Sequence, residues 1–191
     1  MKFLVEDADI DRLRRCFEYW PINGVSIDPA LELDEIKRIR ELIGEDCELH
    51  VPIVSSDAER IVDEAQRLTE ELGSGTYVKI PVGREGFKAM KALELSRVSF
   101  VAVGVCTPIQ ALVAGNCGAS YVAPFVNRLD SRNAVAIVKS MHEAIKRNEL
   151  ETEVIAIGFK NSRQAIELCE YGIGAVIVST DMLSSMIEID H

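Results

Sequence analysis

Short apolar runs alternate with longer amphipathic segments eight times along this 191-residue chain. The short runs read as near-continuous apolar stretches, which is typical of parallel strands buried on both faces. Eight strands that are each followed by a helix predict a (β/α)8 or TIM barrel. The strands are expected at residues 3–5, 24–27, 49–54, 77–80, 100–103, 120–123, 154–157 and 175–178.

Apolar residues at three- and four-residue spacing predict the helices between these runs. In residues 57–72 they form one stripe, Ser56 or Asp57 can cap the first turn, and Gly73 ends the helix. The other helices are expected at residues 9–19, 33–43, 84–95, 107–116, 132–147, 162–171 and 180–189.

The chain is short for a TIM barrel, which usually takes about 250 residues. The sequence therefore predicts a single minimal domain over residues 1–191. A doubly wound open sheet is the alternative. No G-x-G-x-x-G motif follows a predicted strand, and so the barrel is favoured.

Composition excludes several classes of function. A net charge of −10 argues against nucleic acid as a partner, because phosphate binding needs a basic patch. No apolar run reaches the eighteen or so residues of a membrane span, and the acidic start of the chain is unlike a signal peptide. Five cysteines without a C-x-x-C pair predict a reducing, cytoplasmic location, with Cys106 buried rather than nucleophilic.

The carboxyl ends of barrel strands form the active-site face of this fold. Lys79 stands near the end of the fourth predicted strand, where it can reach water, pair with a carboxylate or stay desolvated as an amine nucleophile. Glu6, Asp28 and Arg128 are expected on the same rim. No cluster of His, Asp or Glu there matches a metal-ligand pattern.

Four segments resemble the small transaldolases and fructose-6-phosphate aldolases. They are YVAPFVNRLD at residues 121–130, YVKIP at 77–81, GVSIDP at 24–29 and GFKNSRQ at 158–164. They are similar, in order and in spacing, to YVAPYVNRID, VVKVP, GVTTNP and SFKTPRQ of that family. The chain is identified as a member of it by the first of these above all, since that segment is the most specific.

The resemblance implies a class I aldolase that needs neither a cofactor nor a metal. Lys79 would form a Schiff base with a ketose, and a nearby acid or base would handle protons. Arg128 would hold a sugar phosphate with backbone N–H groups around Gly158, and Ser26 and Asn127 lie within the matching segments. The family also implies a homo-oligomer, although this chain lacks the extra C-terminal helix that its members use in subunit contacts.

Departures from the family surround the conserved lysine. The substitutions are Glu6 for aspartate, Asp28 for asparagine, Pro52 for glutamine or glutamate, Val103 for threonine, Phe125 for tyrosine and Gly158 for serine. They leave the pocket with fewer polar groups but with two carboxylates, Glu6 and Asp28. Either carboxylate could carry protons, because close like charges raise one pKa, or either could pair with Lys79 or Arg128.

Three functions stay open at this stage. The first is a Schiff-base aldehyde-lyase or transaldolase of carbohydrate metabolism that acts on ketoses or ketose phosphates. The second is a sugar-phosphate-binding or repurposed barrel with little aldolase activity, which Pro52, Val103 and Phe125 favour. The third is a barrel enzyme of unrelated chemistry.

Overall fold

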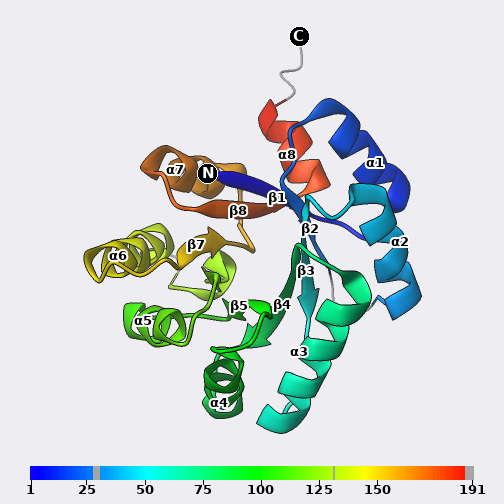
Figure 1. Ribbon diagram of the computed structural model, residues 1–191. Coiled ribbons are helices and arrows are strands. Elements are labelled where there is room, and N and C mark those ends of the chain that lie inside the picture. Colours follow the sequence, from blue (N-terminus) through cyan, green and yellow to red (C-terminus); the bar gives the residue numbers. More distant parts are fainter. Residues whose placement is uncertain (28–30, 131, 188–191) are drawn as a thin grey trace.

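The computed structural model describes residues 1–27, 31–130 and 132–187, in which eight strands alternate with eight α-helices (Figure 1). The strands are β1 (Lys2–Glu6), β2 (Gly24–Ser26), β3 (Glu48–Pro52), β4 (Thr76–Pro81), β5 (Ser99–Val103), β6 (Tyr121–Ala123), β7 (Glu153–Ala156) and β8 (Ala175–Ser179). The helices are α1 (Ile10–Tyr19), α2 (Leu33–Ile43), α3 (Ala58–Leu72), α4 (Arg84–Leu93), α5 (Pro108–Asn116), α6 (Ala134–Arg147), α7 (Ser162–Tyr171) and α8 (Thr180–Ile187).

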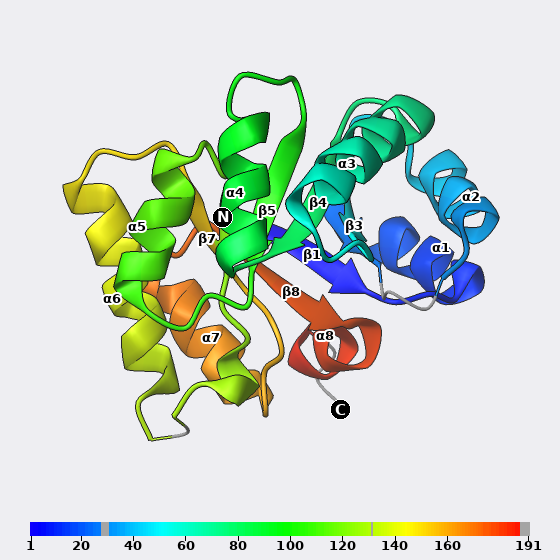
Figure 2. The ribbon, with the colours of Figure 1, turned by 90° about the horizontal axis from the view of Figure 1, so that it is seen from below.

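The strands form a closed parallel barrel in chain order. The barrel closes because β1 pairs with β8. The register runs from Lys2 opposite Ala175 to Glu6 opposite Ser179. The predicted TIM barrel is therefore confirmed and the open sheet is wrong. The helices surround the strands (Figure 1), and in the view of Figure 2 α1 to α3 lie at the right of the barrel and α5 to α7 at the left.

Two apolar clusters divide the core. The larger one lies between strands and helices and includes Val5, Val25 and Val78. The smaller one fills the inside of the barrel and includes Leu4 and Tyr121. Side chains alternate between the two faces of a strand, and so the residue after an outward-facing one projects into the barrel.

Helix ends follow the local chemistry of the sequence. The Asp57 carboxylate accepts a hydrogen bond from the Arg60 N–H and caps α3, as expected, and Gly73 ends that helix. Helices α2 and α7 have the predicted bounds. Helix α6 begins at Ala134 rather than at residue 132 because Arg132 lies in the turn before it.

The segment after β6 forms a short 3-10 helix, η1 (Val126–Arg128), in a stretch for which the sequence indicated neither helix nor strand. One local expectation is wrong. Cys106 is exposed rather than buried, because it lies between β5 and α5 and not in the core.

Candidate active site

Lys79 lies on β4 between two residues, Val78 and Ile80, that are fully buried in the outer core. Alternation along the strand therefore directs Lys79 into the barrel, where it is half-buried. Its Nζ donates hydrogen bonds to Ser26 Oγ at 3.0 Å and to the Ile27 carbonyl oxygen at 2.5 Å. The position of Lys79 is thus the one predicted from the sequence.

Of the two carboxylates expected beside Lys79, the structure describes only Glu6. Glu6 is the last residue of β1, in register with Ser26 on one side and Ser179 on the other. It is exposed, and no ion pair joins it to another residue in the described part of the chain. Asp28 lies outside the described residues. Ser26 itself is 1% exposed, and so the Lys79–Ser26 contact is shielded from solvent.

Apolar residues line the rest of the barrel mouth. Pro52 is in register with Lys79 across β3 and β4, and it presents no polar side chain. Val103 and Phe125 are half-buried and pack against the cluster inside the barrel. The three residues predicted to make the pocket dry therefore do lie around the mouth.

The predicted phosphate-binding residues come together at one edge of this mouth. The Asn127 N–H donates to the Gly158 carbonyl oxygen at 2.8 Å. Gly158 has φ of +68°, and a Cβ there would lie 3.1 Å from Asn127 Oδ1, so glycine permits this close approach. The exposed Arg128 guanidinium lies 4.5 Å from the centre of the Phe125 ring, just beyond the carboxyl end of β6.

A polar network that the sequence reasoning missed fills the opposite, amino end of the barrel. Lys2 Nζ donates to Glu48 Oε1 at 2.5 Å and to the Tyr121 hydroxyl at 3.0 Å, and that hydroxyl donates to Glu48 Oε1 at 2.9 Å. The other Glu48 oxygen, Oε2, is 3.0 Å from His50 Nε2. His50 is 0% exposed, and its ring centre is 5.0 Å from that of Tyr77.

Burial and charge set the ionisation of this network. Burial raises the pKa of the Glu48 carboxyl, but the hydrogen bonds from His50 and Lys2 outweigh it and leave that pKa below its ordinary value. Burial lowers the pKa of His50 more than Glu48 raises it, and the charges of Lys79 and Lys2 lower it further. Glu48 is therefore a carboxylate and His50 a neutral imidazole at neutral pH.

A signal for the network was present in the sequence. Glu48, His50 and Pro52 stand at alternate positions of one strand, and so all three face the barrel interior if one does. His50 belongs to no histidine motif, and so the sequence alone indicates no role for it.

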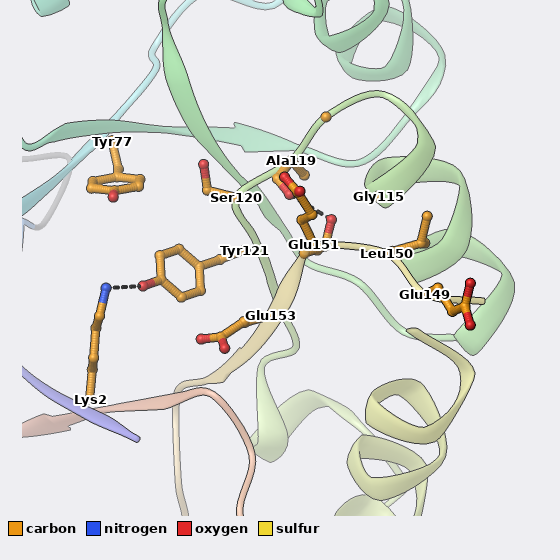
Figure 3. Close-up of a pocket in the computed structure, with 12 residues that line it drawn as sticks. Lys2, Tyr77, Gly115, Ala119, Ser120, Tyr121, Glu149, Leu150, Glu151 and Glu153 are labelled. Atoms are coloured by element: carbon orange, nitrogen blue, oxygen red, sulfur yellow. Dashed lines mark hydrogen bonds between the residues drawn. The ribbon is translucent and has the colours of Figure 1, made fainter. Parts of the chain in front are cut away.

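A cavity of about 660 Å³ opens at the amino end, far from the mouth. Lys2, Tyr77 and Tyr121 point toward one another at one side of it, with Glu153 nearby (Figure 3). Active sites of this fold lie at the carboxyl ends of the strands, and so this cavity is not the candidate active site.

Among residues 1–27, 31–130 and 132–187, no group of three or more His, Cys, Asp or Glu could hold a metal ion. Within the same ranges, no helix has the length and apolar character needed to cross a membrane.

Comparison with known proteins connects this geometry to a family. Residues 24–190 match the family model Transaldolase/Fructose-6-phosphate aldolase. The chain is 30% identical to a Streptococcus pneumoniae protein named probable fructose-6-phosphate aldolase, over 97% of this chain and 88% of that protein.

Two solved structures share the fold. One is a protein described as a candidate fructose-1,6-biphosphate aldolase from Coccidioides immitis, with a TM-score of 0.66, 15% identity and coverage of 93% of this chain and 73% of that one. The other is a flavocytochrome b2 variant with sulfite bound, with a TM-score of 0.68 and 15% identity. It matches 94% of this chain, which spans just over half, 56%, of the flavocytochrome chain. At these identities the likeness shows the fold alone.

Proposed function

The chain belongs to the transaldolase and fructose-6-phosphate aldolase family, and from this premise we propose that it is a Schiff-base aldolase acting on ketoses or ketose phosphates. It acts as an aldehyde-lyase or a transaldolase. The observation that carries the proposal is the place of Lys79, a half-buried amine held inside the barrel mouth by Ser26 and the Ile27 carbonyl. An amine in this position meets a bound carbonyl carbon with little competition from bulk water.

The proposed reaction follows from this placement. Lys79 Nζ adds to the ketose carbonyl carbon, and loss of water leaves an iminium that draws electrons from the adjacent carbon–carbon bond as it breaks. Glu6 is the proposed proton carrier, because its register with Ser26 places it one strand from the Lys79 contact. Asp28 keeps the same role as an expectation from the sequence.

Arg128 is the proposed phosphate ligand. Its exposed guanidinium lies by the Phe125 ring, and its planar donor fork suits phosphate oxygens. Asn127 and the backbone at Gly158 adjoin it, and Ser26 is hydrogen-bonded to Lys79. The proposed substrate is therefore a small sugar or sugar phosphate.

A second candidate function is a sugar-phosphate-binding barrel with little aldolase activity. It is favoured by the apolar residues Pro52, Val103 and Phe125, which surround Lys79 with few groups able to move a proton. Losing a positioned acid or base typically slows a reaction by about 10²–10⁴-fold.

Borohydride trapping separates the two functions. The protein is incubated with dihydroxyacetone or fructose 6-phosphate, reduced, digested and analysed by mass spectrometry. A reduced adduct on Lys79 is expected, absent in Lys79→Met and retained in Lys91→Met, which removes an exposed lysine of α4. Glu6→Gln should slow cleavage at least about tenfold. Binding of fructose 6-phosphate without any adduct would favour the second function.

The homo-oligomer expected from the sequence stays a prediction. Light scattering at micromolar concentration tests it, and a monomer there would contradict it.

A further inference from the structure

His50 is a buried titratable side chain with no part in the mechanism proposed above. It is 0% exposed, inside the barrel, and its Nε2 is 3.0 Å from a Glu48 oxygen. Glu48 is a carboxylate and can only accept, and so Nε2 carries the proton. The neutral ring then presents Nδ1 as a bare acceptor, which has no hydrogen-bond partner within the described part of the chain.

An acceptor without a partner in a sealed interior is unusual, because buried polar atoms are nearly always paired. The place of His50 suggests what the acceptor is for. His50 is in register with Ser26 on β2 and with Tyr77 on β4. Ser26 and His50 therefore stand on neighbouring strands of one interior row, and Lys79 is the next inward residue beyond Tyr77.

Ser26 connects this row to the lysine. Its Oγ accepts a hydrogen bond from Lys79 Nζ at 3.0 Å, and so its own hydroxyl proton is available to an acceptor. In this structure Ser26 Oγ does not hydrogen-bond to His50 Nδ1, so this bond has to form when substrate binds for a proton to pass. The charge of Lys79 acts on the ionisation of His50, which agrees with their closeness. Pro52, in register with Lys79, offers no polar group, and the nearest inward polar residue on β3 is His50.

Resting on the function proposed above, we propose that His50 takes and returns the proton of the Lys79 nitrogen through the Ser26 hydroxyl. Glu48 is a positioning residue that fixes the ring with Nδ1 free to accept. His50 thus supplies proton transfer at the Lys79 nitrogen, in addition to the Glu6 carboxylate proposed above.

The proton steps balance as follows. The Lys79 ammonium gives a proton to Ser26 Oγ while Ser26 gives its hydroxyl proton to His50 Nδ1, and the carboxylate of Glu48 stabilises the imidazolium. The neutral amine then forms a bond to the carbonyl carbon. The former carbonyl oxygen takes one proton from the lysine nitrogen and one back from His50 through Ser26, and it leaves as water. The iminium keeps the single positive charge, and His50 is neutral again.

The titratable groups that face His50 from the surrounding strands are Lys2 on β1, Glu48 on β3, Tyr77 and Lys79 on β4, and Tyr121 on β6. Of these, Glu48 and Lys79 are the ones that the relay uses. The relay requires neutral His50, and so adduct formation should slow as pH falls and His50 becomes protonated.

His50→Gln tests the relay directly. A glutamine amide can still donate to Glu48, and its carbonyl oxygen can accept a hydrogen bond, but unlike Nδ1 it cannot take up a proton near neutral pH. We expect the rate of borohydride-trapped adduct formation with dihydroxyacetone to fall at least about tenfold, with loss of the acidic limb of its pH profile. Free imidazole should restore part of the rate to His50→Ala. His142→Gln, on the outer helix α6, is the matched control and should trap like the unmodified protein.

The outcomes separate this inference from the proposed function. No adduct in the unmodified protein would count against the Schiff-base function itself. An adduct that forms equally fast, with the same pH profile, in His50→Gln and in the unmodified protein would overturn the relay alone. If His50→Gln fails to fold, nitrogen NMR of the histidine rings in the intact protein decides. The His50 Nδ1 signal should move when the adduct on Lys79 is formed and reduced, and an unmoved signal overturns the relay.

Discussion

The two ends of the barrel interior have opposite characters. At the amino end, Lys2, Glu48, His50 and Tyr121 form a connected polar network. At the carboxyl end, Lys79 is hydrogen-bonded to Ser26 among the apolar side chains around the mouth. In this fold the carboxyl end normally holds the chemistry and the amino end the stability.

The contrast teaches that polar groups useful to Lys79 need not lie around it. Pro52 and Phe125 make the mouth apolar, while the row below holds His50 and its carboxylate partner Glu48. In the relay proposed above, a group one row lower in the barrel serves the same lysine. The amino end is then both a stabilising network and, through that proposed relay, a support of the chemistry.

The largest expected effect tests the stabilising half of the comparison. Glu48→Ala leaves His50 and Tyr121 without their shared acceptor, while the partly exposed Lys2 can turn to water. Urea denaturation should show a loss of roughly 2–4 kcal/mol in the free energy of unfolding. Glu151→Ala, an exposed glutamate at the same end, should change it by less than about 0.5 kcal/mol. Equal losses of unfolding free energy in the two variants would mean that the network adds no stability beyond that of an exposed glutamate.

The next effect concerns the mouth. Arg128→Ala should weaken binding of fructose 6-phosphate about 10- to 100-fold and leave binding of fructose nearly unchanged, because a charge-assisted pair to phosphate is lost. Calorimetric titration measures both affinities. Arg132→Ala removes an exposed arginine just beyond η1 and is the control. A parallel loss for both sugars would make Arg128 a structural residue.

Phe125→Tyr should sharpen the comparison by returning a hydroxyl to the dry end. Cleavage of fructose 6-phosphate should rise by up to about tenfold, less than the full range for a positioned acid or base, because the new group is not held in place. Phe87→Tyr, on α4 outside the barrel, is the matched control. A lower rate in Phe125→Tyr would show that the apolar wall is needed as it is.

The smallest effect is a pH dependence of stability. Burial lowers the pKa of His50 below its ordinary 6.5, and so the unfolded chain takes up this proton first as pH falls. The stability present above pH 6.5 should therefore decline below it, by at most about 1.4 kcal/mol per pH unit for this group. Denaturation between pH 7.5 and 5.5 measures the slope, above the range where Glu48 titrates.

His50→Gln should flatten that slope. His142→Gln should flatten it less, because burial lowers the pKa of His142 as well but leaves its ring near the surface of α6. An unchanged slope in His50→Gln would mean that His50 is protonated alike in the folded and unfolded chain.

Much of the fold was predictable because local signals agree with it. Asp57 and Gly73 bound α3 as the sequence indicated, and α2 and α7 have their predicted ends. Strands β4 and β8 extend beyond their predicted ends because pairing continues through residues such as Pro81 and Ser179 that carry no apolar signal. The 3-10 helix η1 was missed because the geometry of a three-residue turn depends on neighbouring loops.

The positions of Lys79 and Arg128 were predictable because both residues stand in recognisable segments, while their roles stay proposals. The partnership of Glu48 with Lys2 and Tyr121 joins three strands distant in sequence, and no local pattern reveals such a contact. The alternation along β3 indicates only that Glu48 faces the barrel interior, not which residues it contacts there.

The pairing of β1 with β8 has a consequence for the order of folding. Strand β1 can pair with β8 only after β8 has been synthesised. One edge of β1 therefore stays unpaired during synthesis of the rest of the chain. The lysine at the start of that edge discourages pairing with another chain in the meantime. Because such contacts span nearly the whole sequence, barrel closure should be a slow, late step in refolding, and the mouth around Ser26 and Lys79 is complete only afterwards.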